Sequence, residues 1–123
     1  MAQEKTVWEM LFEALKNEGI KVYPPATKTG ECTEPYVVVK ESGAAEIPGI
    51  SSQSRYFTVM VYVPKDTYTQ LAREKSKTKE VIAEKLYPIL FPTGEETPDF
   101  YDDTVKAHTT SILYRNSIRN KHL

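Results

Sequence analysis

The 123-residue sequence is poor in the residues that build disulfides and metal sites. It contains one cysteine, Cys32, and two histidines, His108 and His122. A single cysteine cannot form an intramolecular disulfide, and no Cys/His spacing resembles a zinc-binding pattern. We therefore expect a reducing compartment and predict neither a metal nor any other cofactor.

Long apolar runs and an excess of charge of one sign are also missing. No segment approaches the ~18 apolar residues of a membrane-spanning helix, and residues 1–5 lead into an amphipathic segment, unlike a signal peptide. Lys and Arg number 16 against 17 Asp and Glu, for a formal net charge of -1. This balance disfavours the phosphate backbone of nucleic acid as the main partner. We expect a cytosolic protein that makes no membrane contact.

What is present is an ordinary globular composition, 40% hydrophobic and 27% charged, at a length common for one domain. We predict a single domain over residues 1–123 that ends in a basic tail at about 116–123. A capping box at Thr6 and Glu9 and a stop at Gly19 bound a first helix. A break at 64–67 starts a long second helix. Strands are expected at 20–23, 36–40, 55–63, 100–101 and 105–115.

This order, α-β-β-β-α-β-β, excludes a regular succession of parallel crossovers. It favours an α+β fold with an antiparallel or mixed sheet of four to five strands and both helices packed on one face. Three segments without periodicity are expected to be exposed connections: 26–35, 42–54 and 93–98.

The segment 55–63 is the clearest strand, and we predict that it is central because it has the longest apolar alternation. One face carries Phe57, Val59, Val61 and Val63. The other face carries Tyr56, Thr58, Met60 and Tyr62. If the helices cover one face, the second must be polar or meet a partner, and Tyr and Met are enriched at interfaces. Tyr56, Met60 and Tyr62 are therefore core or assembly surface, and we favour a subunit contact.

Candidate catalytic groups are sparse. The only dense carboxylate group, at 95–103, could bind Mg²⁺ or act as acid and base, but nothing apolar nearby would desolvate it. A solvated turn is the favoured interpretation. His108 and Ser111 point to opposite faces of one predicted strand and form no triad. We predict no enzymatic activity, and a metal-dependent hydrolase at the acidic turn remains the catalytic alternative.

Two segments are rich in cations. Between Arg73 and Lys85, glutamates interleave with the lysines, which is typical of a solvated helix face. The C-terminal group is less balanced and could make a weak DNA contact, meet an acidic partner or only favour solubility. Its members are Arg115, Arg119, Lys121 and His122.

Several segments together resemble the tail-completion or tail-terminator proteins of long-tailed bacteriophages and prophages, a group of head-tail joining, minor tail proteins. The resemblance covers nearly the whole chain and rests on element order and residue texture. The segments that carry it are 19–24, 36–39, 55–62 with 66–68, 102–108 and 111–114.

The resemblance implies a structural protein without an active site that forms a ring, typically a hexamer, at the head-proximal end of the tail tube. Its expected partners are further copies of itself, the tail-tube protein and the head connector proteins. It would act in the bacterial host cytoplasm during assembly and then in the virion. The resemblance also suggests that the segments 26–35 and 42–54 point at the tube or lumen.

The predicted interface residues are Tyr56, Met60, Tyr62, Lys28, Glu31, Ile47, Ile50, Arg115 and Arg119. A small ligand-binding or nucleic-acid-binding α+β module fits the same layout, because a fold alone does not fix a function.

Overall fold

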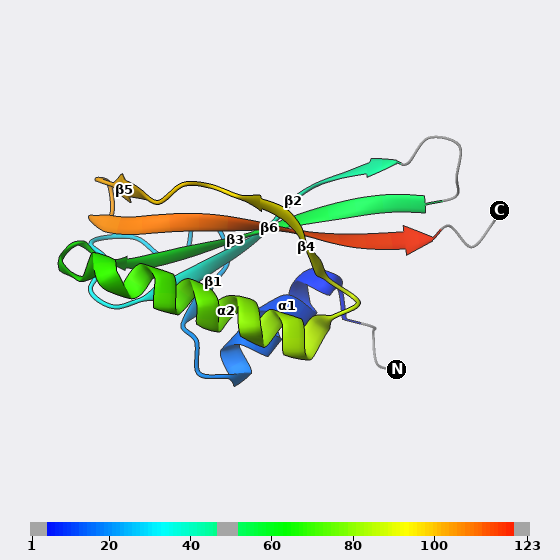
Figure 1. Ribbon diagram of the computed structural model, residues 1–123, viewed down its shortest axis with the longest axis horizontal. Coiled ribbons are helices and arrows are strands. Elements are labelled where there is room, and N and C mark those ends of the chain that lie inside the picture. The colour runs from blue at the N-terminus through cyan, green and yellow to red at the C-terminus, as the bar shows by residue number, and fades with distance from the viewer. Residues whose placement is uncertain (1–4, 47–51, 120–123) are drawn as a thin grey trace.

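A mixed sheet with two helices on one face makes up the protein (Figure 1). The computed structural model describes residues 5–46 and 52–119, with side chains over 5–43 and 54–116. The helices are α1 (Val7–Asn17) and α2 (Leu71–Leu86), with a 3-10 helix, η1 (Lys65–Gln70), directly before α2. The strands are β1 (Val22–Tyr23), β2 (Tyr36–Glu46), β3 (Ser52–Pro64), β4 (Phe91–Glu96), β5 (Phe100–Asp102) and β6 (Ala107–Arg119).

The six strands form one sheet in the order β1-β2-β3-β6-β4, and β5 pairs with another stretch of β6. The β1–β2 pair is parallel and the other pairs are antiparallel. The α+β class and the central place of β3 are therefore confirmed. The strand count is six instead of the predicted four to five, because β4 was expected to be an exposed connection.

Helix α1 begins and ends as its sequence predicts. The Thr6 hydroxyl accepts a hydrogen bond from the Glu9 amide at 3.1 Å, and the Glu9 carboxylate accepts one from the Thr6 amide at 2.9 Å. At the other end, Gly19 has φ of 81°, a conformation that glycine adopts without strain. The Trp8 indole donates to the Val39 carbonyl at 2.9 Å and ties the helix to β2.

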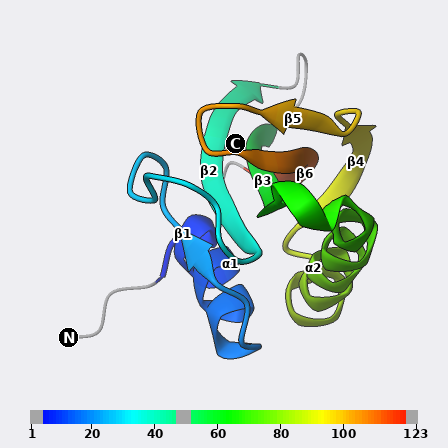
Figure 2. The same ribbon diagram turned by 90° about the vertical axis from the view of Figure 1, so that its left-hand side faces the viewer.

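The main core lies between the helices and one face of the sheet (Figure 2). Leu11 and Leu15 of α1 and Ile82 of α2 are fully buried. They meet the apolar face of β3, where Phe57, Val59, Val61 and Val63 are 0–1% exposed. Among the described residues, no helix is long and apolar enough to cross a membrane.

At one end of the sheet, strands β2, β3 and β6 extend further than the sequence predicts. Residues 42–54 were expected to be a loop, but β2 continues to Glu46 and β3 begins at Ser52. Similarly, β6 extends four residues beyond the predicted end and includes residues 116–119, which we assigned to a tail. Small and polar residues have little strand propensity of their own, so backbone pairing across three strands decides this structure.

These extensions form a projecting structure that we call the β arm, made of residues 41–46, 52–56 and 115–119. Figure 1 shows its three strands continuing past the ends of both helices, away from β5 and η1. Within the arm, Arg55 and Glu41 form an ion pair at 2.8 Å.

Candidate interaction surfaces

The sheet face opposite the helices is partly covered by the chain itself. The connection 24–35 and the turn before β6 fold over it, and the Cys32 amide donates to the Val105 carbonyl at 2.7 Å. A second, smaller core results, whose buried members are Cys32, Tyr36, Val38 and Ala107. The connection 26–35 is therefore docked on the sheet at Cys32, where we had predicted only an exposed loop.

Met60 and Tyr62 belong to this second core. The Tyr62 ring stacks on Tyr36 with ring centroids 4.8 Å apart, and both Met60 and Tyr62 are partly buried against the cluster. Burial raises the pKa of the Tyr62 hydroxyl above its ordinary value. Their own chain therefore covers part of this face, and the subunit contact at Met60 and Tyr62 stays a prediction.

Lys28 and Glu31 lie on the connection that covers the second core. The Lys28 ammonium is 5.8 Å from the centroid of the Tyr23 ring and 5.6 Å from that of Tyr36, within the range of cation–π attraction. Glu31 is exposed. Lys28 thus stabilises its own loop, whereas Glu31 is available to a partner. Ile47 and Ile50 lie outside the described residues.

Tyr56, Arg115 and Arg119 all belong to the β arm. Tyr56 is half-buried and pairs with Arg115 across the β3–β6 ladder. The Arg115 guanidinium lies 4.7 Å from the centroid of the Phe91 ring. Arg119 is the last residue of β6, and its backbone pairs with Ser52. The arm therefore brings together three of the nine predicted interface residues.

The opposite end of the molecule has an aromatic surface that the sequence did not reveal. We call it the aromatic end: Tyr68 of η1, Phe100 and Tyr101 of β5, and His108 of β6. The His108 ring is 4.9 Å from the Tyr68 ring and 5.2 Å from the Tyr101 ring. Tyr68, Phe100 and Tyr101 are 49%, 52% and 43% exposed. Tyr68 thus lies in η1, before α2, and does not join the core that α2 covers.

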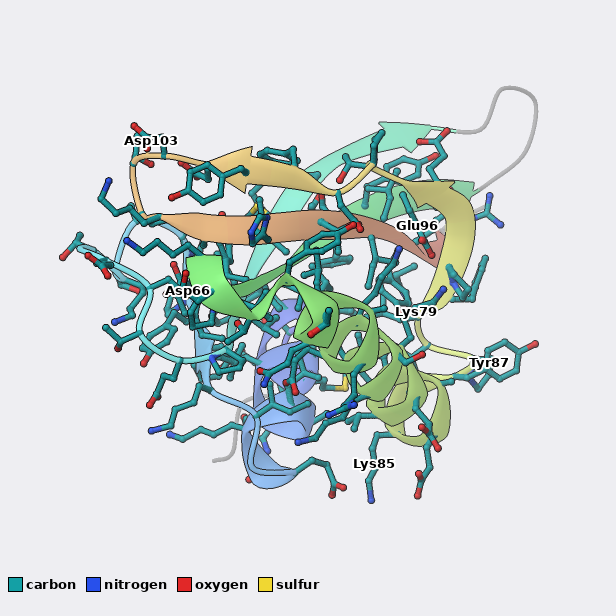
Figure 3. The ribbon with its side chains drawn as sticks, turned by 60° about the vertical axis from the view of Figure 1, so that its left-hand side comes forward. Asp66, Lys79, Lys85, Tyr87, Glu96 and Asp103 are labelled. Carbon is teal, nitrogen blue, oxygen red and sulfur yellow. The ribbon has the colours of Figure 1, made fainter. Side chains whose placement is uncertain are left out.

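The acidic side chains of segment 95–103 do not form one cluster, because several of them contact different partners. The Glu96 carboxylate accepts from the ammonium groups of Lys75 and Lys79 on α2, the latter at 2.7 Å (Figure 3). Asp99 accepts from the Tyr68 hydroxyl at 2.8 Å, and Asp102 accepts from the Thr104 amide at 3.0 Å. Within 5–46 and 52–119, no group of three or more His, Cys, Asp or Glu residues is placed to hold a metal ion.

His108 and Ser111 do not engage each other as a base and a nucleophile. The His108 Nε2 group is 3.0 Å from the Lys65 carbonyl oxygen. The Ser111 hydroxyl is 2.9 Å from that of Thr97. The two side chains thus link η1 to β6 and the segment between β4 and β5 to β6.

The Glu96 contacts predict a small, pH-dependent stabilisation. Hydrogen bonds from Lys75 and Lys79 hold the pKa of the Glu96 carboxyl below its ordinary value of 4.5. Its stabilisation is therefore present at neutral pH and is lost as the pH falls through the lowered pKa of the folded state. Because Glu96 is 30% exposed, Glu96→Gln should cost at most about 1 kcal/mol.

Urea unfolding of wild type and Glu96→Gln at a series of pH values would measure this difference. It should be present at pH ~7 and vanish in acid well below the ordinary carboxyl range. Glu95→Gln is the matched control, since the neighbouring Glu95 side chain is exposed. A Glu96→Gln difference that persists unchanged into strong acid would contradict the ion-pair interpretation.

Surface hollows are small. One lies on the sheet face beside Thr97 and Ser111 (about 240 Å³), one beside β1 and α2 (about 250 Å³), and one under Tyr87 and Leu90 (about 270 Å³). Ligand pockets usually measure ~300–1,000 Å³. The three hollows therefore offer little support for a small-molecule site.

No known protein-family model matches the sequence, and no curated protein is significantly similar to it. The geometry thus defines an α+β domain with two distinct exposed features, the β arm and the aromatic end.

Proposed function

We propose that the protein is a structural assembly protein of a phage or prophage tail. It forms a ring that terminates the tail tube and joins it to the head connector. It acts in the host cytoplasm during assembly and then in the virion. The sequence resemblance to tail-terminator proteins motivates the proposal.

The observation that carries the proposal is the β arm. Three strands extend past the helices that cover the rest of the sheet, and strands with unpaired edges are natural sites of association. A monomer gains little from such an extension, whereas an assembling subunit gains a contact surface. The exposed tyrosines and Phe100 at the other end support the same interpretation, since aromatic residues are enriched at interfaces.

The direct test uses tail tubes assembled from the purified tail-tube protein of a long-tailed phage. Tubes grown with the protein should be shorter and more uniform than tubes grown without it, and electron microscopy should show a ring at one end. Co-sedimentation with preformed tubes measures the binding. Reassembly of tubes in the presence of bovine serum albumin controls for non-specific capping.

The same preparation is then tested for retention on duplex and single-stranded DNA at physiological salt. A protein that leaves tube length unchanged and does not sediment with tubes is not a terminator. If that protein also binds DNA, the nucleic-acid-binding module replaces the proposal.

A further inference from the structure

A contact that repeats from copy to copy around a ring requires two unlike surfaces on each copy. The β arm and the aromatic end are two such surfaces, and Figure 1 places them at opposite ends of the long axis. We propose that the β arm of one copy docks on the aromatic end of the next copy. This inference rests on the proposed ring and names the contact that builds it.

The aromatic end is a suitable acceptor because Tyr68, Phe100 and Tyr101 are exposed and the rings of Tyr68 and Tyr101 are held by contacts with His108. His108 lies between Tyr68 and Tyr101, at centroid distances of 4.9 Å and 5.2 Å. The Tyr68 hydroxyl is also fixed by its hydrogen bond to Asp99. Rings that are ordered before binding lose little conformational entropy when a partner covers them.

The charges of the two surfaces are complementary. Around the aromatic end, four aspartates outnumber two lysines. They are Asp66, Asp99, Asp102 and Asp103, against Lys65 and Lys106. Figure 3 shows Asp66 and Asp103 at this end of the molecule, and the Asp103 side chain is 86% exposed although Lys106 lies 3.8 Å away.

The β arm has the opposite balance. Among its described side chains, two arginines, Arg55 and Arg115, exceed one glutamate, Glu41. Glu41 is already paired with Arg55 inside the arm. An acidic rim on one surface and a basic excess on the other favour a copy of this same chain as the occupant.

The arm also has backbone N–H and C=O groups at its two edges that no described strand pairs. On the outer edge of β2, β1 pairs only with Val37 and Val38. On the outer edge of β6, the pairing with β4 stops at Arg115. The Trp8 indole occupies the Val39 carbonyl on the β2 edge. Among the described strands, the outer edges of residues 40–46 and 116–119 therefore have no strand partner. A β-bulge between Glu41 and Gly43 interrupts the β2 ladder and disfavours simple edge-to-edge pairing of two arms.

Two variants of the full chain test the contact. Each disables one of the two surfaces and leaves the other intact, and we call them half-blocked. The arm variant, Arg55→Glu/Arg115→Glu, reverses the charge of the two described arginines of the arm, so the arm should be repelled by the acidic rim. The end variant, Phe100→Ala/Tyr101→Ala, removes exposed rings and leaves the rim acidic. The matched control, Tyr87→Ala/Ile89→Ala, removes apolar side chains that are 67% and 40% exposed elsewhere on the surface.

Sedimentation velocity over a concentration series gives the result. Wild type and the control should associate with the same concentration dependence, and each half-blocked variant should associate at least about tenfold more weakly. An equimolar mixture of the two half-blocked variants keeps one intact contact per pair. It should therefore form a 1:1 complex that does not grow beyond a dimer.

Three results would overturn the inference: a wild type that is monomeric at every concentration, half-blocked variants that associate like wild type, or a mixture that behaves as two separate monomers. Thermal unfolding verifies that each variant is folded. If a double variant is not folded, Arg55→Glu alone or Phe100→Ala alone takes its place.

Tube binding by the same proteins separates this inference from the proposed function. Heterodimers in the mixture without tube capping by wild type would refute the function and keep the contact. Tube capping by wild type with no heterodimer in the mixture would support the function and refute the contact. An end variant that self-associates normally but no longer binds tubes would assign the aromatic end to the tube protein and overturn the inference.

Discussion

Replacing Phe57 by alanine is expected to lower the free energy of unfolding by about 3–5 kcal/mol. Phe57 is 1% exposed on the central strand and belongs to the main core between sheet and helices. Its removal forfeits the transfer free energy of the ring and leaves a cavity that its neighbours fill only in part. Small domains are stable by ~5–15 kcal/mol, so the variant would lose a large share of its stability.

Tyr56→Ala is the matched control, because it removes an aromatic ring from the adjacent position on the opposite face, where the side chain is half-buried. Urea unfolding followed by circular dichroism should show a clearly smaller loss for this variant. If Tyr56→Ala costs as much as Phe57→Ala, the assignment of the main core to one face of β3 is wrong.

Replacing Tyr36 by alanine is expected to destabilise the second core and release the connection 24–35. The Tyr36 ring is 3% exposed, stacks on Tyr62 and meets the edge of Tyr23 at 5.6 Å. Losing it should cost about 3 kcal/mol. The connection should then become accessible, so trypsin cleavage after Lys28 under native conditions should be faster than in wild type.

Tyr36→Phe keeps the ring and serves as the control, with cleavage close to wild type. It also carries a pH signature. Burial raises the pKa of the Tyr36 hydroxyl from 10.0 to about 12. The stabilisation from the neutral hydroxyl is complete below pH 10.0 and is lost as the pH rises through the folded-state pKa. Tyr36→Phe should therefore resist alkaline unfolding in this window better than wild type.

Alkaline urea unfolding of the two proteins measures the difference. Tyr62 and Tyr114 are also buried tyrosines with raised pKa values, and they remain in both proteins, so the comparison isolates Tyr36. Equal stability of Tyr36→Phe and wild type throughout the alkaline range would show that the Tyr36 hydroxyl is solvated in the folded state.

Local sequence patterns were sufficient to predict features that depend on residues of a single helix or strand. The capping box at Thr6 and Glu9 and the stop at Gly19 define α1 because a helix end is satisfied by residues within a turn of it. The alternation in residues 57–63 identifies the central strand and its core face, because successive side chains of a strand point to opposite faces.

The surfaces proposed for assembly depend on contacts between distant parts of the chain. Local patterns did not predict that Cys32 and Val105 would meet and cover Met60 and Tyr62, or that Tyr68, Tyr101 and His108 would gather at one end.

By itself, the sequence determined the α+β class, the first helix, the central strand and the apolar face that the helices bury. The tertiary structure decided how far the sheet extends and which residues remain exposed. The physical reason is that Gly43 and its small, polar neighbours on β2 have weak strand propensity and become strand only through pairing with β3, which β6 supports from the other side. The burial of a side chain likewise depends on segments that are distant in the sequence. Tyr62 packs against the cluster that contains Cys32 and Ala107, and Tyr68 contacts His108 of β6.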